Sequence, residues 1–231
     1  NNDIYNVLTE LNDGNGVYIS GAGKGNVVRG NYVHDTPTES GGEAIRCDDD
    51  QNDVLIENNV VFRYQTYGTG FCSKGCNHFI NNIVACPPGE VVRGMLSLES
   101  HNGAKNKLGA GSVTIRNIGD GSVIIRNIFY ATKNNQPFVY MKFMTGLLDV
   151  INIDRNIYFN TSDPKAADEY LTLARKSGNE INSIQSDPLF KDAKNGDFTL
   201  LPGSPAIGLG FRPFKLDAGV HVDGYIADAA V

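Results

Sequence analysis

The segment EAIRCDDDQNDVLIENN, residues 43–59, decides the predicted fold because it holds one complete unit of a repeat. Its first half, residues 44–48, alternates apolar and polar residues with a period of two, as a half-buried β-strand does. Its second half, residues 54–59, is another short apolar strand that ends on paired asparagines. Three aspartates, Asp48 to Asp50, follow the first strand, and grouped carboxylates are unfavourable unless something binds them. The segment therefore predicts both a repeat and a candidate site.

Asparagine recurs at one position of each repeat unit. The column consists of Asn2, Asn31, Asn59, Asn82, Asn127 and Asn156. The steps between successive members are 29, 28, 23, 45 and 29 residues, and we attribute the long step to an insertion around residues 101–111. Short strands with a period in the twenties indicate a solenoid, and stacked asparagines can hydrogen-bond from one unit to the next. The sequence predicts an all-β protein, a right-handed parallel β-helix, with handedness taken from the general rule for parallel crossovers.

The first strand of each unit can be aligned by its period of two. The residues expected to face the core are Val17, Ile19, Ile45, Cys47, Phe71, Leu96, Leu98, Val139 and Met141. The residues expected to face outward are Tyr18, Ser20, Arg46, Asp48, Cys72, Lys74, Ser97, Glu99, Tyr140 and Lys142. This outward face is polar, charged and aromatic, which favours a ligand groove over a plain solvated surface.

The remainder of the chain differs from the repeat. We expect residues 1–160 to form the β-helix coils, with an inserted loop near residues 100–120, and residues 161–231 to form a C-terminal helix, a last coil and an irregular cap. The helix is predicted over Asp163–Lys176, because helix formers follow Ser162-Asp163-Pro164 and Gly178 lies just past the end. The chain begins in the middle of a unit, so we expect an upstream segment or a second chain to complete the β-helix.

Composition excludes several classes of function. The net charge of −6 argues against nucleic-acid binding, which needs a basic surface. No apolar run is long enough to cross a membrane. The four cysteines do not form spaced metal-binding pairs, and we interpret them as core thiols.

Two carboxylates on the outward face are the leading catalytic candidates. Asp48 and Glu99 fall in one column, two strands apart, with Lys74 between them, which places them about 9.5 Å apart if neighbouring strands are about 4.8 Å apart. That separation favours an inverting glycoside hydrolase, in which one carboxylate is the base and the other the acid. This mechanism requires no cofactor. The residues expected to bind the carbohydrate substrate are Tyr18, Arg46, Asp49, His101, Tyr140 and Lys142.

The same residues leave other functions open. In a Ca²⁺-assisted polysaccharide lyase, Lys74 is the base, and Asp48, Asp49, Asp50 and Asp53 hold the ion. Alternatively, the aspartates form a solvated turn and Lys74 a salt bridge, and the chain is a non-catalytic glycan-binding solenoid. His34 and Asp35 form a further candidate dyad, although no serine or cysteine is visibly placed to complete a triad.

Four features of the chain occur together: the asparagine column, EAIRCDDDQ with LIENNVV, GTGFCSKG with INNIV, and the terminal SDPLFKD and GDFTLLPGSPAIGLGF. This combination resembles the pectate-lyase-like β-helix superfamily. Within it, the chain is most similar to bacterial β-helix glycoside hydrolases related to xylosidases and fucosidases. The resemblance implies a secreted protein, extracellular or periplasmic, that acts on a poly- or oligosaccharide. Lys74 stands where xylosidase-type members have an acid, which argues against a retaining xylosidase mechanism. Thr69 stands where polygalacturonases have histidine, so polygalacturonase activity is not carried over.

Overall fold

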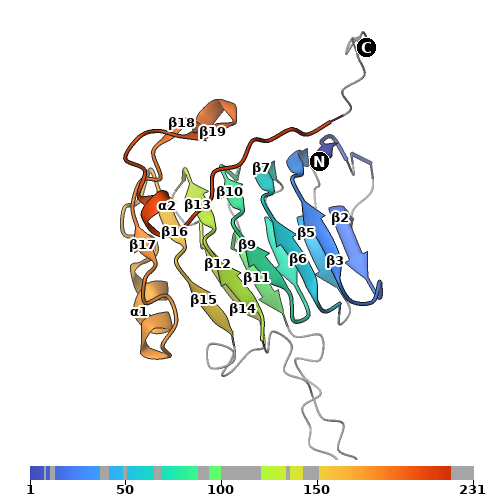
Figure 1. The fold of residues 1–231 in the computed structure, drawn as a ribbon, viewed down its shortest axis with the longest axis horizontal. Helices are drawn as coiled ribbons and strands as arrows, with labels where there is room; N and C mark the ends of the chain where they lie inside the picture. Colours follow the sequence, from blue (N-terminus) through green and yellow to red (C-terminus); the bar gives the residue numbers. More distant parts are fainter. Residues whose placement is uncertain are drawn as a thin grey trace, which may run out of the picture.

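The computed structural model describes residues 1–7, 9–10, 14–36, 42–48, 51–64, 69–87, 94–99, 121–133, 136–142 and 151–219. Most of its regular structure consists of three parallel β-sheets, named here in the order in which the chain visits them (Figure 1). Sheet 1 contains β2 (Asn15–Ser20), β5 (Glu43–Asp48), β8 (Phe71–Ser73), β11 (Leu96–Glu99) and β14 (Val139–Lys142). Sheet 2 contains β3 (Asn26–Arg29), β6 (Val54–Glu57), β9 (His78–Ile80), β12 (Val123–Ile125) and β15 (Asn152–Asp154). Sheet 3 contains β1 (Asp3–Ile4), β4 (Tyr32–Thr36), β7 (Val60–Tyr64), β10 (Ile83–Ala85), β13 (Ile128–Ala131), β16 (Ile157–Asn160) and β17 (Ile184–Gln185).

The chain passes through sheets 1, 2 and 3 in the same order in each repeat, and one such passage is called a coil below. Each strand pairs in parallel with the corresponding strand of the next coil. The predicted alignment of sheet 1 is confirmed: Val17 is paired with Ile45, Ile45 with Phe71, Phe71 with Leu96, and Leu96 with Val139. The repeat in the sequence is therefore a repeat of stacked coils.

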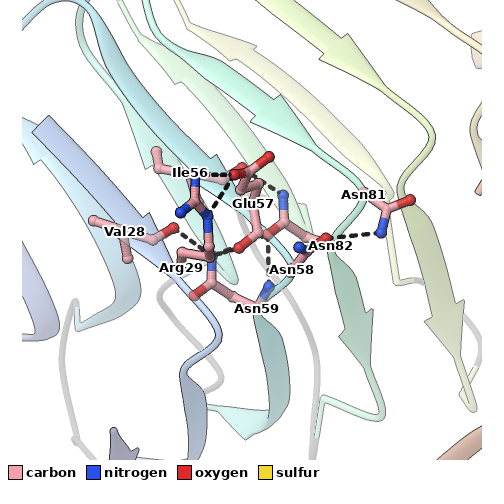
Figure 2. Close-up of polar contacts among 8 residues, drawn as sticks. All are labelled: Val28, Arg29, Ile56, Glu57, Asn58, Asn59, Asn81 and Asn82. Atoms are coloured by element: carbon pink, nitrogen blue, oxygen red, sulfur yellow. Dashed lines mark hydrogen bonds and ion pairs between the residues drawn. The ribbon is translucent and has the colours of Figure 1, made fainter. Parts of the chain in front are cut away.

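The asparagine column forms a continuous ladder at the turn between sheets 2 and 3. The side-chain oxygen of Asn59 accepts from the backbone N–H of Asn31 at 3.0 Å and from the Asn31 side-chain amide at 2.9 Å. Asn59 in turn donates its backbone N–H and its side-chain amide to the side-chain oxygen of Asn82, and this amide also donates to the carbonyl of Val28 (Figure 2). The same pattern joins the other members of the column from Asn2 to Asn156. The predicted ladder is confirmed.

The residue before each asparagine from Asn31 to Asn156 has a left-handed backbone. Its φ is +70° at Gly30, +54° at Asn58, +61° at Asn81, +59° at Arg126 and +57° at Arg155. Glycine and asparagine tolerate this conformation, which explains the paired asparagines of the repeat. Arginine has no such preference, so Arg126 and Arg155 depart from the pattern.

The core fills the space between the three sheets. Ile45, Cys47, Phe71, Leu96 and Leu98 from sheet 1 are buried in it, as predicted. The four cysteines are free thiols. Cys47 belongs to this core, whereas Cys86 packs on the outer side of sheet 3, and burial raises the pKa of each of these two thiols to about 12. Cys72 is buried on the outward face of sheet 1, and Cys76 is half-buried at a turn. The interpretation of all four cysteines as core thiols is therefore wrong for these two.

The predicted C-terminal helix exists but begins later than expected. Helix α1 spans Asp168–Lys176, whereas Asp163 to Ala167 form turns in which the Asp163 side chain accepts from the backbone N–H of Lys165. Gly178, with φ of +78°, follows the end of the helix as predicted. Leu171 of α1 packs against the core, so the helix covers the last coils.

The segment after α1 does more than close the end of the stack. It contains β18 (Phe190–Asp192), a 3-10 helix (Ala193–Asn195), β19 (Asp197–Leu200) and α2 (Pro205–Gly208). Phe198 and Phe211 from this segment pack on the outer side of sheet 3, in a second apolar cluster with Val60 and Ile83. From α2 the chain runs back across the coils, and Gly219 donates to the carbonyl of Asn1 (Figure 1). Sheet 3 is thus buried on both faces, which explains its continuous apolar runs.

Glu180 terminates the asparagine ladder. Its carboxyl group is fully buried and accepts from the hydroxyls of Tyr158, Tyr170 and Ser183, and the Ser183 hydroxyl accepts from the backbone of Asn156, the last rung. Burial raises the pKa of Glu180, and the hydroxyl donors that lower it offset only part of this effect.

This raised pKa makes a prediction for pH dependence. Because the pKa of Glu180 is higher in the folded state, its contribution to stability is complete below the unfolded value of 4.5 and is lost as pH rises through the folded value. We expect the free energy of unfolding of the native chain, relative to Glu180→Gln, to fall as pH rises above 4.5. Urea denaturation of both chains across that range measures this difference, and a difference that stays constant would contradict the prediction.

Candidate active site

Three predicted site residues occupy one column at the end of sheet 1. In the backbone register Cys47 is paired with Ser73, and Ser73 with Leu98. The residues that follow them along the chain are Asp48, Lys74 and Glu99. The backbone N–H of Lys74 also donates to the carbonyl of Cys47 at 2.9 Å, as continued parallel pairing requires. The backbone thus places Lys74 between Asp48 and Glu99, as the sequence predicted.

Asp48 is the centre of the polar contacts in this region. Lys74 Nζ lies 2.6 Å from its Oδ1, and Arg46 Nε lies 3.0 Å from its Oδ2. The Tyr18 hydroxyl donates to the same Oδ2 at 2.9 Å. Burial alone raises the pKa of Asp48, but the donors Lys74 and Arg46 outweigh it and hold this pKa well below the usual range. Asp48 is therefore a carboxylate at any ordinary pH.

Glu43 is a site residue that the sequence reasoning missed. Its side chain is fully buried, and its Oε2 accepts from Arg46 Nη1 at 2.8 Å. Burial lowers the pKa of Arg46, but the charges of Glu43 and Cys72 and the hydrogen bonds to Glu43 and Asp48 together outweigh it and leave this pKa raised. The alternation of inward and outward residues along β5 would place Glu43 on the inner face with Ile45. Ala44 and Ile45 both belong to the core cluster, so the alternation is interrupted before it reaches Glu43. The sequence did contain a signal for this residue. Glu43 lies three residues before Arg46, which is itself close to the charged Asp48.

Tyr18 has two roles in the geometry. The residue is 51% exposed, in agreement with its predicted outward position on sheet 1. Its hydroxyl is meanwhile fixed on Asp48, one coil away. Arg46 and Lys74 are much less exposed, with side-chain values of 12% and 18%. The exposed ring therefore lies at the edge of a nearly buried cluster of four charges, made by Glu43, Arg46, Asp48 and Lys74.

The outward face of sheet 1 is not open along its whole length. Cys72 and Ser97, which continue the column of Tyr18 and Arg46, are fully buried. Tyr140 is paired with Ser97 and is half-buried. The prediction of one continuous polar groove is therefore wrong for the middle strands. Thr69, another residue singled out by the sequence, is buried and donates to the carbonyl of Phe71.

Several predicted site residues fall outside the description. Asp49, Asp50 and His101 lie outside the described residues. Glu99 and Lys142 are paired by their backbones, but their side chains are likewise outside the description.

The calcium site receives no support from the part of the chain that the structure describes. Within that part, no group of three or more histidine, cysteine, aspartate or glutamate side chains gathers closely enough to hold a metal ion. Asp53 is exposed at a turn, with φ of +60°. Asp48 is already bound by two cationic side chains.

His34 and Asp35 lie on β4 in sheet 3, away from the Asp48 cluster in sheet 1. The Nδ1 atom of His34 is 2.7 Å from Asp35, and its Nε2 atom is 3.0 Å from Asp3. Arg63 also binds Asp35 at 2.6 Å, and its charge lowers the Asp35 pKa against the effect of burial. Both ring nitrogens of His34 therefore face carboxylates, and neither is placed to activate a nucleophile.

Comparisons with protein-family models, with curated proteins and with solved structures gave no match to this chain. Among the described residues, neither helix has the length and apolar character needed to span a membrane.

Proposed function

We propose that this chain is a carbohydrate-active enzyme, an inverting glycoside hydrolase built on a right-handed parallel β-helix of the pectate-lyase-like type. The observation that carries the proposal is the column of Asp48, Lys74 and Glu99. Two strand spacings separate the outer pair, so their backbones are about 9.5 Å apart. Inverting glycosidases have carboxyl groups about 6.5–9.5 Å apart, because a water molecule must fit between the sugar and the base.

The electrostatics of Asp48 suggest how the two roles are divided. A general acid must carry a proton before the reaction, and the lowered pKa of Asp48 makes it a poor candidate for that role. We therefore propose Asp48 as the base that activates water and Glu99 as the acid that protonates the leaving oxygen. The bonds from Lys74 and Arg46 reduce the basicity of Asp48, so substrate binding has to draw one of these cations away.

Substrate recognition follows from the edge of the cluster. The exposed ring of Tyr18 offers a stacking surface for a sugar, and its hydroxyl ties that surface to Asp48. Tyr140, on the same face and half-buried, is proposed as a second stacking surface. Asp49, His101, Arg46 and Lys142 remain proposed substrate contacts. The protein is proposed to be extracellular or periplasmic.

The lyase is the second candidate, and the geometry favours it less. A lysine that removes a proton must offer a free lone pair, whereas Lys74 Nζ is already engaged with Asp48 at 2.6 Å. A calcium ion bound to Asp48 would also have to displace two cations. The third candidate, a glycan-binding solenoid without turnover, is consistent with the exposed Tyr18 and uses the charged cluster only for structure.

The products distinguish the three candidates. We expect release of reducing ends from a plant, algal or host glycan, unchanged by EDTA, with inversion at the anomeric carbon observed by NMR. An ultraviolet-absorbing unsaturated product that disappears with EDTA would instead establish the lyase. Binding without turnover on every glycan of the panel would establish the binding solenoid.

A partner is proposed for the first coil. Within the described residues, β1, β2 and β3 are the edge strands of sheets 3, 1 and 2. Edge strands present backbone groups that pair readily with another strand. We propose that an upstream segment or a second chain adds a coil there.

A further inference from the structure

Arg126 and Arg155 lie at the turn between sheets 2 and 3, and Arg212 of the C-terminal segment is bonded to Asn81 at the same turn. Arg126 and Arg155 occupy the left-handed position in successive coils, and the Arg126 N–H donates to the carbonyl of Asp154. Asn81 holds the same position one coil earlier, where its backbone N–H donates to Ile125. The side chain of Asn81 fixes the third arginine, since it exchanges two 2.7 Å hydrogen bonds with the backbone of Arg212.

The placement of Arg126 and Arg155 is costly for the backbone. Three earlier coils fill this position with Gly30, Asn58 and Asn81, which suit a positive φ. Non-glycine residues in this conformation are disfavoured and cluster at functional sites. Two successive coils therefore carry arginine at a position where the backbone does not favour it.

These three arginines also differ from the other arginines of sheets 1 to 3. Arg29, Arg46 and Arg63 each form an ion pair with a carboxylate. None of the ion pairs found among the described residues involves Arg126, Arg155 or Arg212. The adjacent acid, Asp154, binds Asn182 at 2.7 Å through both carboxylate oxygens, and, against the effect of burial, the charge of Arg155 also helps to lower the Asp154 pKa, although these two described side chains form no ion pair.

Arg126 has a buried donor that the described residues leave unused. Its Nε atom is buried and has no hydrogen-bond partner, although the side chain as a whole is only half-buried. Gly210 passes directly over this side chain, so that a methyl group in place of its hydrogen would lie 3.5 Å from Arg126 Cδ. Buried side-chain donors nearly always have a partner, so the unpaired Nε atom sets Arg126 apart from an ordinary structural arginine.

The three charges repel one another in a protein whose net charge is −6. Burial lowers the pKa of Arg126, and the charges of Arg212 and Arg155 lower it further. An anion between the guanidinium groups would remove this repulsion. Guanidinium groups bind planar or tetrahedral oxyanions through paired N–H donors.

We propose that Arg126, Arg155 and Arg212 form a binding site for an oxyanion, the sulfate, phosphate or carboxylate group of a ligand. The site is separate from the Asp48 cluster, and it does not depend on the proposed hydrolase activity. Two sources provide this chemistry: a free inorganic anion, or an acidic group carried by a sugar chain.

Inorganic sulfate and phosphate are the first probes. We expect saturable binding to the native chain by isothermal titration calorimetry, and a rise in melting temperature beyond that produced by sodium chloride at equal ionic strength. Arg126→Asn and Arg155→Asn each introduce the residue that Asn58 and Asn81 already place at this position, so the fold should be retained. The double variant should bind at least about tenfold more weakly, since each charge-assisted hydrogen bond contributes strongly.

Arg29→Gln is the matched control, because it removes the same charge from a half-exposed arginine that is paired with Glu57. It should bind sulfate like the native chain. Equal responses of the native chain and the double variant would overturn the site, since sulfate also stabilises proteins without binding a specific site. A sulfated or uronic oligosaccharide that binds more tightly than the inorganic ion through the same arginines would identify a sugar chain as the source, and equal affinity would identify the free anion.

Discussion

Asn59→Leu is expected to lower the free energy of unfolding by about 3–5 kcal/mol, a large effect for one uncharged side chain. Asn59 is fully buried, and its oxygen is the acceptor for two N–H groups of Asn31. Leucine has a similar volume but leaves both donors buried without a partner. The carbonyl of Val28 also loses the hydrogen bond that the Asn59 side-chain amide donates to it in the native chain. Each unpaired buried group costs about 1–3 kcal/mol, so two donors account for most of the expected loss.

Urea denaturation followed by circular dichroism measures this change as a shift in the midpoint at unchanged slope. Two controls separate the ladder from the residue type. Asn152→Ala removes an exposed asparagine of β15 and should change stability by less than about 0.5 kcal/mol. Asn2→Ala removes the exposed first rung, whose partners water can replace, and should cost less than the central rung. A loss at Asn59 no larger than that at Asn2 would show that the ladder adds little to stability.

The repeat could be predicted from the sequence because its cause is local. Each turn needs a residue that tolerates a left-handed backbone, followed by an asparagine whose amide bonds the next coil. This need selects a particular pair of residues at every turn, and the pairs are visible in the sequence as a column. The register of sheet 1 follows in the same way, since one face of each strand is buried and a slip of one residue would reverse it. The positions of Asp48 and Lys74 depended only on this register.

Other features depend on contacts between distant segments and left a weaker signal. Glu43 was missed because Ala44 and Ile45 both enter the core, which interrupts the alternation of β5. The docking of Phe198 and Phe211 on the outer side of sheet 3 depends on packing with Val60, far away in the sequence. The late start of α1 reflects competition between the Asp163 turn and the helix, which residue preferences do not decide.

Glu99→Gln is expected to reduce kcat on the natural glycan by about 10²–10⁴-fold with little change in KM, because the proposed general acid acts in the transition state. Hydrolysis of a glycosyl fluoride should be largely retained, since fluoride leaves without protonation. A variant that had merely lost its structure would lose both reactions. Equal losses on the two substrates, or near-native turnover on both, would exclude Glu99 as the acid.

Asp48→Asn tests the base. We expect a loss of similar size on both substrates, because activation of water precedes either leaving group. This change also leaves the cations of Arg46 and Lys74 facing each other, so circular dichroism and the melting temperature should accompany the kinetics. Asp53→Asn is the matched control: it removes a nearby exposed carboxylate at a turn where asparagine suits the positive φ. It should leave a hydrolase fully active, whereas a calcium-dependent lyase using Asp53 would lose most of its activity.

The pH dependence of glycan hydrolysis by the native chain tests Asp48 as the proposed base. The donors Lys74 and Arg46 hold the pKa of Asp48 below its ordinary value of 3.8, so the proposed base remains ionised as pH falls to that value. Activity should therefore persist below pH 3.8 until Asp48 becomes protonated or the protein unfolds in acid. Lys74→Met removes the closest donor, so the acid limb should move to higher pH and the carboxylate should become more basic. An acid limb that does not move would mean that a group other than Asp48 activates the water.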